Sequence, residues 1–253
     1  MLLDFFRICG YYSVFVYLNE RLKPAYLQKE QSKVEKSAEV PQKMLGFLHA
    51  LITAAHGIFY AAGWIDFPQL HSARLISTAF LVFDFVLSVM NYETDGEEAL
   101  TAHPIGTGIH HFITLIFIYG SLFASSLAGC LAFFWSEVPV CFLNATWYYF
   151  YIGQSNSRVC AILSICTVTT YFIFRVCMFP IMFLFIMLPN VNWFNPLTYP
   201  ILLLLGLVYI LNLLWFFKLL NKTAKLLPNI YGLEMLSKFP LYSLLPKRVA
   251  KRT

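Results

Sequence analysis

Two adjacent histidines, His110 and His111, stand at the front of a run of residues apolar enough to enter a lipid bilayer. An imidazole acts as a nucleophile or a general base when a carboxylate orients it, and Asp84 is the carboxylate expected to do so. Adjacent helix positions point about 100° apart, so one ring would do chemistry and the other would bind or pack. Thr114 shares a face with His110 and could orient it. The alternative is that a neutral imidazole only joins helices through a hydrogen bond.

We also single out titratable residues deeper in the apolar runs, where a charge facing lipid costs at least about 2.5–3.5 kcal/mol. At a rise of about 1.5 Å per residue, Asp84 lies about 10 Å from the cytosolic end of its run and the histidine pair about 6–8 Å. Glu137 and Arg175 both lie about 20–24 Å deep, where they can neutralise each other. His56 is expected to be neutral and bonded to a neighbouring helix. Two such polar layers indicate an interior, partly wet cavity.

The composition defines the class of protein that positions these residues. Hydrophobic residues make up 59% of the 253-residue chain and charged residues 12%, about half the charged share of a soluble domain. We therefore expect an integral membrane protein, with 18% aromatic residues suited to lipid-facing surfaces. The +5 charge does not indicate nucleic-acid binding, because the basic residues fall in two flanking segments. The six cysteines lack metal-ligand spacing and are interpreted as packing residues, with no metal.

The hydropathy pattern predicts an all-α, multi-pass transmembrane bundle of about six core spans plus an N-terminal span. A span needs about 20 apolar residues, or about 17 at the short end. The N-terminal run is the weakest, because Asp4 and Arg7 lie near its start. The fifth core span is long, so it is expected to be tilted or irregular near Pro180. The predicted spans are 2–18, 44–65, 75–91, 106–124, 127–150, 159–188 and 197–220.

The distribution of Lys and Arg predicts the topology, because these residues are retained on the cytosolic side. The polar loop 19–43 holds six of them, and residues 218–252 at the end of the chain hold eight. An even number of spans separates the two segments, so both can face the cytosol; Arg74 is the one basic residue on the wrong side. We divide the chain into an N-terminal helix and loop, 1–43, a transmembrane domain, 44–225, and a basic tail, 226–253.

Several short motifs occur in the order found in the TLC domain family, which the chain resembles over roughly residues 45–225. The stretches are AFLVFDFVLSVMNY, GIHHFITL, SEVPVCFLNATWYY, YFIFRVCMFPIMF and LNLLWFFKLLNKTAKLL. Each motif is weak alone, but five in order are a specific signal. They contribute Asp84, His110, His111, Glu137, Asn144, Trp147, Arg175, Asn212, Trp215 and Lys218.

The resemblance implies a helical bundle around a central lipid-sized cavity, usually in the endoplasmic reticulum. In the ceramide synthases of this family, a double histidine and acidic residues transfer an acyl chain from acyl-CoA to a sphingoid amine. This chain departs from the synthase pattern in WSEVPVCF. Ser136 stands where the synthases carry a histidine, Glu137 replaces the first acid, and the second acid is missing. The smaller TLC-domain proteins, linked to membrane lipid composition, are therefore the closer match.

The expected function is membrane lipid homeostasis, with acyl transfer to a lipid amine as one version of it. His110, His111 and Asp84 are the candidate catalytic residues, beside the mouth of an elongated apolar cavity near the cytosolic leaflet. The alternative is a non-catalytic lipid-binding chaperone, sorting or translocation factor.

We expect no cofactor, acyl-CoA as a candidate substrate, a lipid or acyl chain as ligand, and a homodimer or membrane-protein partner. The endoplasmic reticulum is the expected location, with the plasma membrane as alternative. We expect the polar layer of the cavity to comprise Glu137, Arg175, Asn144 and Trp215.

Overall fold

The computed structural model describes residues 2–27, 34–90, 110–115, 134–190, 194–196 and 198–231. All regular elements among these residues are helical, as predicted, and they include no strand. Short helical pieces lie at 110–115 and 134–136. The longer elements are α1 (Leu2–Leu27), α2 (Val34–Ala61), α3 (Phe67–Met90), α6 (Val138–Tyr151), α7 (Arg158–Tyr171), η2 (Phe172–Cys177), α8 (Met178–Met182), η3 (Phe183–Met187), η4 (Leu188–Asn190) and α9 (Thr198–Tyr231).

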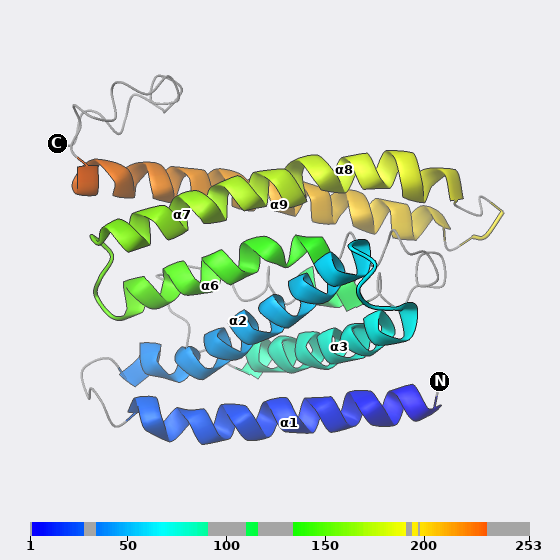
Figure 1. Ribbon diagram of the computed structural model, residues 1–253, viewed down its shortest axis with the longest axis horizontal. Coiled ribbons are helices and arrows are strands. Elements are labelled where there is room, and N and C mark those ends of the chain that lie inside the picture. The colour runs from blue at the N-terminus through cyan, green and yellow to red at the C-terminus, as the bar shows by residue number, and fades with distance from the viewer. Residues whose placement is uncertain are drawn as a thin grey trace.

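The helices form an elongated bundle, with most of them lying side by side along its long axis (Figure 1). α1, α2 and α3 pack on one another, α2 also packs on α6, α6 packs on α7, and α7 packs on α9. The row from α7 through α8 runs beside α9 (Figure 1). The polar residues of the apolar runs therefore have neighbouring helices to face instead of lipid.

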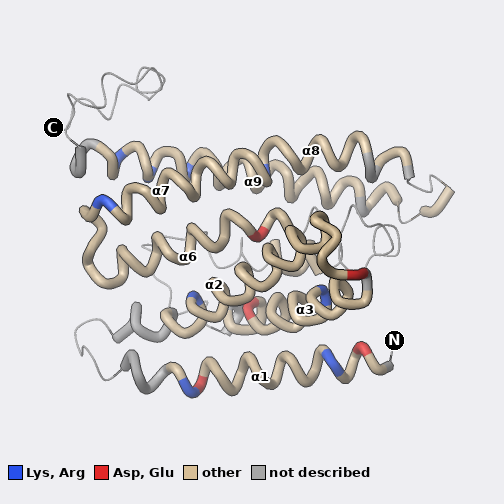
Figure 2. Tube along the Cα trace, in the orientation of Figure 1, with Lys and Arg blue, Asp and Glu red and all other residues tan. Residues whose placement is uncertain are grey.

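Four described helices are long and apolar enough to cross a membrane: Val40–Ala61, Pro68–Leu87, Arg158–Phe185 and Thr198–Leu227. Figure 2 shows that charged positions are sparse along the bundle. The chain is thus a multi-pass integral membrane protein. The full count of six core spans plus one stays a prediction, since most of the expected span 106–124 lies outside the described residues.

The predicted loop at 19–43 is wrong for the part that the structure describes. α1 continues to Leu27 and α2 already begins at Val34. Apolar length measures how far a helix stays in lipid, but Glu, Lys, Gln and Ala are good helix formers and continue a helix into water. The same effect carries α9 on to Tyr231, beyond the expected end of its span.

The expected irregularity near Pro180 is confirmed. Two π-helical segments, η2 and η3, flank the short helix α8 that contains this proline. A proline has no N–H to donate to the carbonyl four residues earlier, which here belongs to Val176. The Tyr209 hydroxyl of α9 instead donates to that carbonyl at 3.2 Å. Satisfying a freed backbone group in this way is what a bilayer interior requires.

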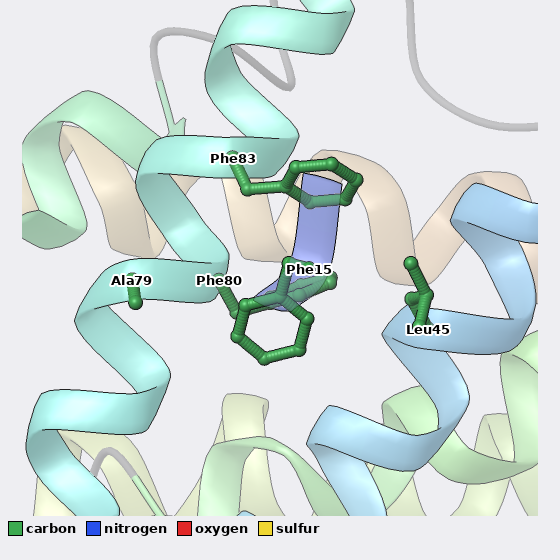
Figure 3. Close-up of a cluster of buried hydrophobic side chains, with 5 residues drawn as sticks. All are labelled: Phe15, Leu45, Ala79, Phe80 and Phe83. Atoms are coloured by element: carbon green, nitrogen blue, oxygen red, sulfur yellow. The ribbon is translucent and has the colours of Figure 1, made fainter. Parts of the chain in front are cut away.

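A cluster of buried side chains holds α1 against α2 and α3. Figure 3 shows Phe15 of α1 beside Phe80 and Phe83 of α3, with Leu45 of α2 in the same cluster. The rings of Phe15 and Phe80 meet edge to face, with centroids 5.5 Å apart. This geometry is favourable for an aromatic pair.

Small and hydroxyl-bearing residues bring the other helices close together. Gly57 of α2 lies so near residue 134 that an added Cβ would stand 2.7 Å from the Cβ of Phe134. The buried hydroxyls of Thr53 on α2 and Ser77 on α3 are 3.0 Å apart, at hydrogen-bond distance. Small residues and hydroxyl bonds of this kind are typical of helix contacts inside membranes.

Candidate functional site

The first polar group of the bundle pairs His111 with Asp84. Nδ1 of His111 lies 3.1 Å from Oδ2 of Asp84, and both side chains are largely buried. The other carboxylate oxygen accepts a 2.7 Å hydrogen bond from the Gln42 side chain of α2. The His111 contact is at ion-pair distance for a protonated imidazole, and its geometry is not that of a hydrogen bond. The predicted contact between Asp84 and one histidine is thus confirmed, and Gln42 fixes the carboxylate from its far side.

His110 faces a different neighbour from His111, as the angle between adjacent helix positions predicts. The two imidazole centroids are 5.7 Å apart, with their planes 49° apart. The His110 ring instead meets the edge of Trp215 on α9, with centroids 5.0 Å apart. Thr114 does not orient this ring, because its hydroxyl donates to the His110 main-chain carbonyl. Hence His111 is the histidine that contacts the carboxylate, and His110 packs against α9.

The second polar group joins Glu137 to Arg175, as their matched depth predicts. Glu137 is the N-cap residue of α6, and Arg175 belongs to the π-helical segment η2. Nη2 of Arg175 lies 3.7 Å from Oε1 of Glu137, and the two side chains are only 8% and 11% exposed. The Nε–H of Arg175 donates to the Ser136 carbonyl at 2.9 Å. The guanidinium also lies over the Tyr171 ring, 5.2 Å from its centroid.

His49 of α2 is a member of this second group that the sequence analysis did not single out. Its side chain is 1% exposed, and its Nδ1 lies 3.9 Å from Oε2 of Glu137. The ring stacks on Phe80 of α3, with centroids 4.2 Å apart and planes 13° apart. The sequence does contain features that could have identified His49. It is titratable, lies inside a predicted span, and precedes His56 by seven residues, which is nearly two helical turns.

The other singled-out residues have more local roles. Nδ1 of His56 pairs with the Ile52 carbonyl of its own helix at 2.7 Å, so among the described residues the hydrogen bond of His56 is within α2 and not, as expected, to a neighbouring helix. A histidine ring can pair with the main-chain carbonyl four residues earlier in its own helix, so it does not need a partner on another helix. Asn144 lies against Gly46 of α2, where an added Cβ would stand 3.2 Å from its side-chain nitrogen. Asn212 accepts a 3.0 Å hydrogen bond from the Tyr171 hydroxyl.

The two groups are linked through the helices that carry them. α2 supplies Gln42 to the first group and His49, seven residues later, to the second. α3 supplies Asp84 to the first group and, one turn earlier, Phe80 to the second. The second group therefore begins about 6–10 Å further along these helices. This spacing places the two polar groups next to each other along the interior of the bundle.

Chemically, the first group can move a proton and the second can make hydrogen bonds. A carboxylate beside Nδ1 favours the tautomer with a proton on that nitrogen, which leaves Nε2 as a base. Among the described residues, no three His, Cys, Asp or Glu side chains are grouped so that they could hold a metal ion. The central cavity and its opening stay predictions.

The bundle and its two polar groups are those of a multi-pass helical membrane protein with titratable residues in its interior. The family model of the TLC domain matches residues 43–221. The chain therefore belongs to the TLC domain family, and the resemblance drawn from its motifs is confirmed. Neither the search of curated proteins nor that of solved structures gave a match.

Proposed function

We propose that this protein handles membrane lipids and transfers an acyl group to a lipid amine, with His111 as the base. The observation that carries the proposal is the 3.1 Å contact between His111 and Asp84, whose other oxygen is held by Gln42. A carboxylate beside an imidazole suits a general base, because it stabilises the imidazolium that proton transfer creates, whereas a protein that only holds lipid does not require this pair. Membership of the TLC domain family supports a lipid substrate.

In the proposed reaction, Nε2 of His111 takes a proton from the attacking amine. The nitrogen bonds to the thioester carbonyl of an acyl-CoA, the carbon–sulfur bond breaks, and the proton passes to the leaving sulfur. Asp84 stabilises the imidazolium that exists between the two proton transfers, and Gln42 keeps the carboxylate in place. His110, packed on Trp215, would shape the wall beside the reacting groups. We propose the endoplasmic reticulum membrane as the location, as the family resemblance implies.

The test is a lipidomic comparison of cells that lack the protein and express wild type, His111→Ala, Asp84→Asn or His56→Ala. His111→Ala should lower the rate of product formation by about 100- to 10,000-fold, the usual contribution of a general base. Asp84→Asn should also lower it, because the amide cannot stabilise an imidazolium. His56→Ala is the matched control, since the hydrogen bond that His56 makes among the described residues is to its own helix, and it should retain product.

Equal expression and equal melting temperature of the variants would show that the losses are chemical. A lipid profile that responds to loss of the protein but is restored fully by His111→Ala would refute acyl transfer. That result would favour the non-catalytic alternative, in which the bundle holds or sorts lipid or a neighbouring membrane protein.

A further inference from the structure

The group formed by His49, Glu137 and Arg175 is incompletely hydrogen-bonded. The carboxylate of Glu137 lies 3.9 Å from His49 and 3.7 Å from Arg175, and both distances exceed that of a hydrogen bond. Neither ring nitrogen of His49 has a hydrogen-bond partner among the described residues, although both nitrogens are buried. Buried polar groups are nearly always paired, so two open positions on one buried ring require an explanation.

Packing alone does not account for a histidine at this position. The ring of His49 stacks flat on Phe80, and a phenylalanine would make the same contact without burying two nitrogens. Nδ1 instead lies 3.9 Å from the acidic side chain of Glu137, which keeps 11% of its surface exposed. The exposed part of Glu137 is the side from which a partner would approach the group and complete its hydrogen bonds.

The charges of the group define the partner that it can take. Glu137 and Arg175 carry opposite charges, so the group has no net charge while the imidazole is neutral. It offers donors from the guanidinium, an acceptor from the carboxylate, and one donor and one acceptor from the ring. A phosphate would be repelled by Glu137 and a quaternary ammonium by Arg175. A hydroxyl, which donates and accepts at once, matches all three side chains.

We infer that His49, Glu137 and Arg175 form a subsite that binds a hydroxyl group of an uncharged lipid inside the bundle. The inference deepens the proposed lipid handling and rests on lipid entering the bundle, but it does not require acyl transfer. His49 is a specificity-determining residue in this arrangement, because both of its buried ring nitrogens lack a hydrogen-bond partner among the described residues. The His111–Asp84 pair belongs to the first polar group and is not part of this subsite.

The test is photo-crosslinking of the purified full chain in lipid nanodiscs with two alkyne-tagged probes. One is a photoactivatable monoacylglycerol, which carries free hydroxyls, and the other is the methyl ester of the same acyl chain. Wild type should capture the monoacylglycerol about tenfold more strongly, the effect of a satisfied hydrogen bond against an unpaired buried one. His49→Phe, which keeps the stacking on Phe80, should reduce this ratio to about one. His56→Phe, on the same helix, should leave it unchanged.

A third probe, the phosphate-bearing lysophosphatidate of the same chain, should be captured less than the monoacylglycerol by wild type. Equal capture of the hydroxyl-bearing and ester probes by wild type would overturn the inference without any variant. A preference that persists in a folded His49→Phe protein would overturn it too. His111→Ala separates the two proposals, since it should abolish acyl transfer and retain the probe preference. In His111→Ala, loss of product with the preference intact would leave the subsite standing. In His49→Phe, loss of the preference with product retained would show that the subsite is separate from the transfer reaction.

Discussion

Replacing Arg175 with methionine removes the guanidinium but keeps a long side chain that fills most of its space. The change leaves Glu137 buried without its counter-charge and deletes the donor to the Ser136 carbonyl. At the 3.7 Å separation of the pair, the attraction is about 4–5 kcal/mol for an effective dielectric constant of about 20. Breaking a buried pair from one side usually costs about 3–5 kcal/mol, because an unpaired charge remains. We expect a loss of that size.

The assay is thermal unfolding of the detergent-purified protein at one fixed scan rate. A loss of about 3–5 kcal/mol corresponds to a fall in Tm of about 6–20 °C for a chain of this size. Adding Glu137→Gln to Arg175→Met removes the stranded charge. The double variant should therefore be more stable than the sum of the single changes predicts, by at least about 1 kcal/mol. Arg158→Met is the control, because Arg158 is exposed at the start of α7.

A Tm for Arg175→Met within about 2 °C of wild type, or strict additivity of the two changes, would refute this reasoning. Either result would mean that the pair is solvated in the membrane protein, so that neither charge depends on the other.

Three further changes test other parts of the structure. Gly57→Ala should destabilise the fold by about 1–3 kcal/mol through its clash with Phe134, and an unaltered Tm would contradict the close approach. Tyr171→Phe removes the hydroxyl bonded to α9 and should cost about 0.5–1.5 kcal/mol in the same melts, whereas a more stable variant would show that the bond contributes nothing. Single cysteines placed in 19–43 and in 226–253, in a cysteine-free background, should both be labelled from the cytosol. Labelling of one segment only from the lumen would exclude an even number of spans between them.

The pairs within each polar layer could be predicted from the sequence because depth in a membrane is nearly one-dimensional. Each residue of a span adds a fixed rise, so counting from the span end places Glu137 level with Arg175 and Asp84 level with the histidine pair. Isolated charges at such depths are costly, and side chains at one level therefore pair. The structure confirms both pairings.

What the count could not supply is the rotation of each helix about its own axis. Rotation decides that His49 faces Glu137, and that His56 closes a bond within α2 instead of reaching another helix. Gln42 was missed for a different reason, since it carries no charge and falls in a segment predicted as a loop. The π turn that contains Arg175 also changes the direction of the side chains after it, and a regular helical count does not include such a turn.

Helix α1 lies outside the residues matched by the TLC domain model, but its aromatic contact with α3 connects it to the interior of that domain. The TLC domain match begins at residue 43, whereas Phe15 belongs to the preceding helix. Phe15 packs on Phe80, and the other neighbour of Phe80 is the imidazole of His49. Two ring contacts therefore join an accessory helix to the interior of the domain. Substitutions in α1 can adjust the shape of that interior while every residue of the shared domain stays the same.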